Sequence, residues 1–158
     1  MTNAQNMPDP QATAEAVAAT MYAQDRASQW LGMKVDEVRP GYARLRMQVR
    51  EEMLNGLRMC HGGIIFTLAD SAFAFACNSH NVITVAAACQ VDFLKPGRPG
   101  DWLVAEAVER VLGRGSGVYD VSVVNQDGET VALFRGKSHR LKGEVAGALH
   151  AAAGQAGS

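Results

Sequence analysis

Residues 62–78 read GGIIFTLADSAFAFACN, and this stretch decides the fold. It contains no proline, and its only polar side chains are those of Thr67, Asp70, Ser71 and Asn78. A helix with so few polar side chains has no face suited to water, so it must be buried almost all round. The sequence therefore predicts one long helix at the centre of the domain.

Segments with the alternation of β-strands flank this helix. Tyr42–Arg50 reads YARLRMQVR, in which apolar and polar residues alternate as in a half-buried strand. Four more strands are predicted after the helix: Val82–Leu94, Trp102–Leu112, Gly117–Val124 and Thr130–Leu141. Their short connections favour an antiparallel meander, because parallel strands need crossovers of a dozen residues or more. We expect an α+β fold in which a highly curved antiparallel sheet wraps around the central helix.

The two ends of the chain differ from this central part. Residues 12–31 contain helix formers with apolar side chains at helical spacing, so we expect an N-terminal helix there. Residues 143–158 have too few large apolar side chains to offset the entropy of ordering, and we expect a flexible tail. Residues 1–142 then form a single domain, for which the 47% hydrophobic content supplies an adequate core.

Charge and cysteine content argue against several classes of protein. Fifteen basic residues nearly balance sixteen acidic ones, so we expect no partnership with nucleic acid or an anionic membrane. The N-terminal region has no basic segment followed by an apolar run, and we expect a cytoplasmic protein. The cysteines, Cys60, Cys77 and Cys89, are odd in number and lie in apolar sequence, which indicates reduced thiols. No cysteine or histidine pair has metal-ligand spacing, so no metal is expected.

The start of the predicted helix has the chemistry of an anion site. Gly62 and Gly63 would offer unpaired backbone N–H groups at the positive end of the helix dipole, with no side chain to block a substrate. A glycine-rich turn that only begins a helix is the alternative. Asp70 favours a functional site, because a carboxylate among apolar neighbours carries a desolvation penalty. For Asp70 the alternative is a hydrogen bond to a neighbouring element or subunit.

The spacing of these residues predicts a site shared between subunits. Gly63 and Asp70 lie on nearly the same helix face but about 10 Å apart along the axis, at ~1.5 Å per residue. A carboxylate attacking a carbonyl must lie about 3 Å from it while the oxyanion donors are also about 3 Å away. Two antiparallel helices from two subunits, each supplying its N-terminus to the other's Asp70, would satisfy both distances.

Six motifs between about residues 20 and 142 carry a resemblance: Leu54-Asn55-Gly56, Cys60-His61-Gly62-Gly63, Leu68-Ala69-Asp70, Ala76-Cys77-Asn78, Val91-Asp92-Phe93-Leu94-Lys95-Pro96-Gly97 and Ala132-Leu133-Phe134-Arg135-Gly136-Lys137-Ser138-His139-Arg140. Together they closely resemble the phenylacetate-degradation thioesterases of the PaaI type. His-Gly-Gly followed by an Asp two helical turns later is typical of the hot-dog thioesterase superfamily. The resemblance implies the hot-dog fold, a homotetramer built as a dimer of dimers, and an active site across the dimer interface.

The resemblance also implies an activity and its residues. The activity is hydrolysis of aryl-acetyl-CoA esters, such as phenylacetyl-CoA and its hydroxylated derivatives, without a cofactor. Asp70 would be the nucleophile or general base, and Gly63, with Gly62 beside it, would give the oxyanion N–H. His61 and Asn55 would complete the site. Their alternatives are a histidine that only caps the helix and an asparagine that only forms a turn.

Two segments are candidates for binding CoA, whose phosphates suit basic side chains. The first comprises Lys95, Pro96, Gly97 and Arg98, and the second comprises Arg135, Gly136, Lys137, Ser138 and His139, followed by Arg140. Ordinary solvated surface charges are the alternative.

Two other functions compete with thioester hydrolysis. A hot-dog enoyl-CoA hydratase typically has a histidine a few residues after its Asp, whereas the next histidine after Asp70 is His80. A non-catalytic acyl-CoA sensor should carry a partner-binding or DNA-binding appendage, and the N-terminal helix has no basic helix-turn-helix pattern. A thiol nucleophile at Cys60 is disfavoured because no orienting acid is identifiable.

Overall fold

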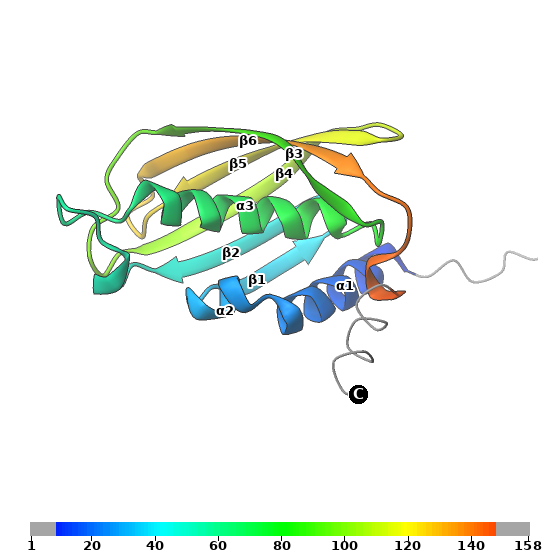
Figure 1. The fold of residues 1–158 in the computed structure, drawn as a ribbon, viewed down its shortest axis with the longest axis horizontal. Coiled ribbons are helices and arrows are strands. Elements are labelled where there is room, and N and C mark those ends of the chain that lie inside the picture. The colour runs from blue at the N-terminus through cyan, green and yellow to red at the C-terminus, as the bar shows by residue number, and fades with distance from the viewer. Residues whose placement is uncertain (1–8, 148–158) are drawn as a thin grey trace, which may run out of the picture.

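A six-stranded antiparallel sheet curves around one long helix in the computed structural model, which describes residues 9–147 (Figure 1). The helix, α3, spans Gly62–Asn78, as predicted from the sequence. The strands, in their order across the sheet, are β1 (Lys34–Arg39), β2 (Tyr42–Gln48), β4 (Trp102–Leu112), β5 (Ser116–Val124), β6 (Thr130–Arg140) and β3 (Thr84–Phe93). This arrangement confirms the α+β class and the central helix.

Helix α3 is buried on one side only. Leu68, Ala72 and Phe73 are almost completely buried against the sheet. In contrast, Gly63 is exposed and Thr67, Asp70 and Ala74 are half-buried. These four residues recur at intervals of three and four, so they share one helix face, the open face of α3. The prediction of burial almost all round is therefore wrong for the single chain.

Strand β3 lies at an edge of the sheet and pairs with β6, not with β4. The predicted meander is correct only for β4, β5 and β6, which are joined by tight turns. The link from β3 to β4, Leu94–Asp101, is longer and contains two prolines, so it does not form a tight hairpin. Residues 85–90 of this edge strand are all exposed, so neither of its faces is covered there.

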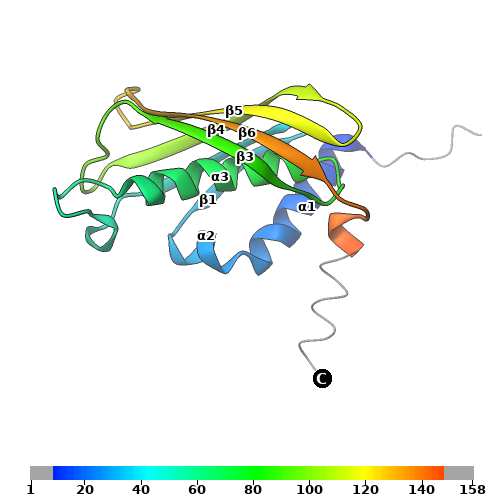
Figure 2. The same ribbon diagram turned by 45° about the horizontal axis from the view of Figure 1, so that its top comes forward.

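The N-terminal region forms two helices where one was expected. Helix α1 spans Pro10–Gln24 and α2 spans Arg26–Trp30. Asp25 interrupts them because it has left the helical conformation, and its carboxylate caps α2 by accepting the N–H of Ser28 at 2.9 Å. Figure 2 shows both helices below the sheet, on the side where α3 lies. No helix within residues 9–147 has the length and apolarity needed to span a bilayer.

The first residues of the expected tail are ordered. The carbonyl of Gly143 accepts the N–H of Ile83 at 3.1 Å, and Val145 is buried. The N–H of Ala146 is bound by the Asn81 side chain at 3.2 Å. Flexibility was therefore wrongly expected for residues 143–147, while residues 148–158 lie outside the described part of the chain.

Candidate active site

The first turn of α3 offers one free backbone donor. His61 is the N-cap, and its Nδ1 accepts the N–H of Gly63 at 2.9 Å. The N–H groups of Ile64 and Ile65 both reach the carbonyl of His61. Among residues 9–147 the N–H of Gly62 has no acceptor. The expectation that Gly63 supplies the oxyanion donor therefore needs correcting: Gly62 is the available one.

A groove of about 310 Å³ borders this free donor. It is lined mainly by apolar side chains and includes one lysine; its residues are Met59, Cys60, Gly62, Ile65, Phe93, Leu94, Lys95 and Pro96. The ring of Phe93 lies across Gly62, where a Cβ would come within 3.2 Å of Phe93 Cζ. Only glycine fits there without moving the ring, so this position tolerates no side chain. The sequence did not single out Phe93, because alternation does not show which helix residue a strand side chain reaches.

Asp70 lies on the open face of α3 with its carboxylate uncommitted. Among residues 9–147, the Asp70 side chain makes no hydrogen bond or ion pair. The alternative role, a hydrogen bond to a neighbouring element, is therefore not seen in this part of the chain. Burial raises the pKa of the Asp70 carboxyl above its usual range. The charge of Asp70 also contributes to raising the pKa of Cys89, after burial, which indicates that Asp70 lies near the exposed edge strand β3. An uncommitted carboxylate with a raised pKa is suited to taking up a proton.

Asn55 organises the loop before α3. Its Oδ1 accepts the N–H groups of Leu57 at 2.9 Å and Met59 at 3.2 Å. Leu54 and Cys60 form an isolated β-bridge that closes the loop. Asn55 thus forms a turn through its side-chain oxygen, and its part in the active site stays a prediction.

The cysteines are poor nucleophiles. Burial raises the pKa of the Cys60 thiol to about 11 and that of Cys77 to about 12. Both are therefore protonated at neutral pH, and the thiolate needed for attack is scarce. Within residues 9–147, no three His, Cys, Asp or Glu side chains are grouped to hold a metal ion.

The first CoA-binding candidate segment borders the groove. Lys95 and Pro96 line it, although Lys95 Nζ is paired with Glu129 at 2.5 Å. Gly97 is buried, and its carbonyl accepts the N–H of Cys60 at 2.8 Å. Arg98 is exposed. The groove therefore includes Lys95 and Pro96, whereas Gly97 supports its wall from behind.

The second candidate segment is split between two faces of β6. Gly136 and Ser138 are buried, and a Cβ on Gly136 would come within 2.9 Å of the Phe73 ring. The prediction that these two residues bind CoA is wrong, because alternate strand residues point to opposite faces. Arg135, Lys137 and His139 are exposed on the outer face.

The two basic segments are also far apart. The N–H of Lys95 is bound by Val131 at one end of β6, at 3.2 Å. Lys137 lies six residues further along that strand, which corresponds to about 20 Å at ~3.3 Å per residue. Both lysines of one chain therefore do not hold the same phosphate.

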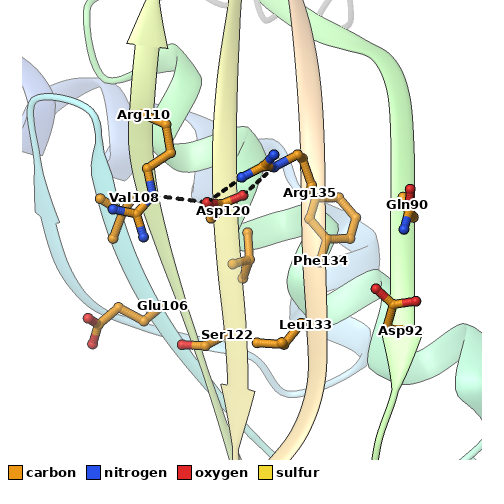
Figure 3. A pocket seen from close by; sticks show the side chains of 11 residues that line it. Gln90, Asp92, Glu106, Val108, Arg110, Asp120, Ser122, Leu133, Phe134 and Arg135 are labelled. Carbon is orange, nitrogen blue, oxygen red and sulfur yellow. Dashed lines mark hydrogen bonds and ion pairs between the residues drawn. The ribbon is translucent and has the colours of Figure 1, made fainter.

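A hollow of about 540 Å³ lies on the outer face of the sheet (Figure 3). In its centre Asp120 binds Arg135 through two hydrogen bonds, of 2.6 and 2.9 Å, and Arg110 at 3.0 Å. The residues that line it come from β3, β4, β5 and β6, and none comes from α3. It is therefore separate from Gly62 and Asp70, and the Arg135 guanidinium predicted to bind CoA is already paired with Asp120.

Comparison with known proteins agrees with the fold and the helix start. Residues 57–132 match the thioesterase superfamily model. The acyl-coenzyme A thioesterase PaaI of Escherichia coli is 50% identical over 130 residues, covering 82% of this chain and 93% of that protein. A putative esterase of Archaeoglobus fulgidus is 39% identical over 80% of this chain and 82% of its own.

Solved structures show the same relationship. The E. coli PaaI protein from the phenylacetic acid degradation operon matches with a TM-score of 0.85 and 48% identity, covering 86% of this chain and 99% of that one. A hypothetical thioesterase from Streptococcus pneumoniae, solved with coenzyme A, matches with a TM-score of 0.68 and 26% identity, covering 71% and 90%. With half of its residues identical to PaaI over most of both chains, this chain belongs to the thioesterase superfamily and is a hot-dog thioester hydrolase of the PaaI type.

Proposed function

We propose that this enzyme hydrolyses acyl-CoA thioesters, and aryl-acetyl-CoA esters such as phenylacetyl-CoA and its hydroxylated forms in particular. The observation that carries the proposal is the free N–H of Gly62, which opens onto an apolar groove with Lys95 in its wall. The likeness to PaaI supports CoA as the thiol part and phenylacetate catabolism as the context. The reaction needs no cofactor, and we place the enzyme in the cytoplasm.

The proposed chemistry uses Gly62 and Asp70 on opposite sides of the thioester. The N–H of Gly62 donates to the carbonyl oxygen and stabilises the negative charge that develops there. Asp70 takes a proton from a water molecule while the water oxygen attacks the carbonyl carbon. The C–S bond then breaks, and the thiolate leaves and is protonated. Direct attack by the Asp70 carboxylate, followed by hydrolysis of the anhydride, gives the same products.

We propose that the two groups come from different subunits. Gly62 and Asp70 of one chain are about 12 Å apart along α3 at ~1.5 Å per residue, too far for one carbonyl. Both the open face of α3 and the unpaired edge of β3 lie next to Asp70, and a second copy pairing along β3 would cover them. The resemblance to PaaI-type enzymes extends this to a tetramer of two such dimers.

The structure gives an argument against the hydratase alternative. His80 Nε2 is bonded to Glu109 at 2.8 Å beyond the C-terminal end of α3. Asn78, the last residue of α3, is already about 12 Å from Asp70 along the helix axis at ~1.5 Å per residue, and His80 follows it. It is therefore not placed to act with Asp70 on an enoyl thioester.

A thiol-release assay tests the activity directly. The panel contains aryl-acetyl, short-chain and long-chain acyl-CoAs, with hydroxylated phenylacetyl-CoA included. We expect the highest kcat/KM on the aryl-acetyl substrates. Binding of these thioesters without thiol release would instead favour the acyl-CoA sensor.

Mixing two inactive variants tests the shared site. Asp70→Asn and Gly62→Ala each disable every site in their own homodimer. In a heterodimer one site carries both changes and the other carries neither, so random mixing should restore about one quarter of wild-type activity. Mixing Asp70→Asn with Asp70→Ala is the matched control and should restore none. Absence of recovery in the first mixture would place both groups in one chain.

A further inference from the structure

We propose that Phe93 is a positioning residue of the thioesterase site: its ring shields the Gly62 N–H from water and directs the thioester carbonyl onto it. This inference rests on the proposed function for its kinetic part. Its structural part is independent, because it concerns how accessible one backbone donor is to solvent.

The ring is held at Gly62 by a well-anchored backbone. Phe93 is the last residue of β3 and pairs with Ala132 of β6. Directly after it, the N–H groups of Leu94 and Lys95 both reach the carbonyl of Val131, at 2.8 and 3.2 Å. The strand therefore has little freedom at this point, and the ring keeps its place over α3.

The orientation of the ring leaves the donor free. A Cβ at Gly62 would meet Cζ of Phe93 at 3.2 Å and both Cε atoms at 3.5 Å, and these nearly equal distances place the face of the ring, at its Cζ end, over the glycine. The face of an aromatic ring accepts a hydrogen bond only weakly, so the ring does not replace a carbonyl oxygen as a partner for a backbone N–H. Phe93 thus excludes water from one side of Gly62, while the Gly62 N–H keeps no acceptor among residues 9–147.

The side chain of Phe93 is partly exposed and borders the groove at Gly62. Its side chain stays 52% exposed, while Ile65 and Cys60 beside it are buried. Single exposed apolar residues are common, so exposure alone decides nothing. What distinguishes Phe93 is that its ring lines the same groove as Gly62 and Lys95. A thioester carbonyl that reaches Gly62 through this groove must pass along the ring.

Shielding of the donor should act on the transition state more than on binding. A hydrogen bond to a developing oxyanion is stronger where water is excluded, because the local dielectric is lower. Losing the ring leaves the donor in place but hydrated. The change therefore weakens stabilisation of the transition state while leaving most substrate contacts intact.

The test compares Phe93→Ala, Phe93→Leu and Phe93→Tyr with the surface control Val111→Ala, whose side chain is 62% exposed on β4. For Phe93→Ala we expect kcat to fall about ten- to a hundredfold, because a hydrated donor retains only part of its effect. KM should change less than about threefold. Phe93→Tyr should keep near wild-type kcat, Phe93→Leu should lie between, and the control should be unchanged.

A second readout does not depend on activity. Amide hydrogen exchange measured by NMR should become at least about fivefold faster at Gly62 in Phe93→Ala. Exchange at Gly63, which is held by His61, should stay the same. If Phe93→Ala does not fold, Phe93→Leu carries both measurements.

The outcomes separate this inference from the proposed function. If wild-type enzyme releases no thiol from any acyl-CoA, the proposed function fails, and the exchange rates alone decide the shielding role. If kcat and Gly62 exchange are both unchanged in Phe93→Ala and Phe93→Leu, the inference is overturned. A rise in KM with kcat unchanged also overturns it, because Phe93 would then only bind substrate.

Discussion

The Nδ1 of His61 and the N–H of Gly63 are joined by a 2.9 Å hydrogen bond, so one of the two glycine donors is used within the chain. His61→Ala removes this N-cap and should destabilise the protein by about 1 kcal/mol. His61→Asn keeps a side-chain acceptor and should recover most of that loss. Thermal unfolding of the three proteins measures the difference. If stability is unaffected but activity is lost in both variants, His61 acts on substrate and not as a cap.

The burial of Asp70 predicts the pH dependence of activity. Its pKa lies above the usual carboxyl value of 3.8 because burial penalises the charged form. Since the charged form is the base, kcat/KM should rise with pH through this raised pKa. Asp70→Asn should lower kcat by at least about a hundredfold and remove that acid limb. A pH–rate profile checks both, and a limb near 3.8 would show that the site is open to water.

The charged Asp70 carboxylate should lower the stability of the folded enzyme at neutral pH. A carboxyl whose pKa is raised on folding stabilises the native state fully at pH below its unfolded value, and this contribution is lost as pH rises through the folded pKa. The uncharged Asp70→Asn variant should therefore unfold at a higher temperature than wild type at pH 7. The advantage should disappear in acid. Equal midpoints at both pH values would indicate that Asp70 is well solvated.

Alanine substitutions at two neighbouring residues of β6, Gly136 and Lys137, should have different effects. Gly136→Ala places a Cβ within 2.9 Å of the Phe73 ring and should destabilise the fold by about 1–3 kcal/mol. Lys137→Ala, on the exposed face, should leave stability nearly unchanged and raise KM if this lysine contacts CoA. Denaturant unfolding and steady-state kinetics on both variants distinguish a core position from a ligand contact. A KM effect in Gly136→Ala at unchanged stability would contradict the assignment of Gly136 to the core.

Tyr119 should limit stability in alkali. It is buried, and its hydroxyl donates to Glu109 Oε2 at 2.6 Å, the oxygen that also bonds His80. Burial, and then the Glu109 contact, raise the Tyr119 pKa above 10.0, so native-state stability should fall as pH increases past the value of the unfolded tyrosine. Tyr119→Phe should cost about 1 kcal/mol at neutral pH. Its stability should then depend less on pH above 10 than that of wild type, as pH-dependent melting can show.

Much of the fold could be predicted from local sequence. The apolar run at 62–78 predicts the central helix, and the period-two alternation predicts Trp102–Leu112 with the bounds observed in β4. The position of β3 could not be predicted, because alternation identifies a strand but not its neighbour. The break at Asp25 is also not evident from the sequence, because helix-forming residues lie on both sides of it.

The candidate site was only partly predictable. Gly62, His61 and Asp70 were found because their residue types suit a helix start and a buried carboxylate. The choice between Gly62 and Gly63 depended on which N–H the His61 side chain takes, and Phe93 depended on a contact between distant segments. Applying the strand alternation to Arg135–His139 would have excluded Gly136 and Ser138, since every second residue of a strand faces the core.

The unpaired edge of β3 should make the stability of the protein depend on its concentration. Val85 to Gln90 present exposed, mostly small and uncharged side chains, without the lysine or proline that commonly blocks unwanted strand pairing. A single chain thus exposes an unpaired strand edge, which the proposed pairing with a second copy would cover. The proposed dimer would couple folding to assembly, and the melting temperature should then rise with protein concentration. At low expression, loss to aggregation would compete with the formation of active enzyme.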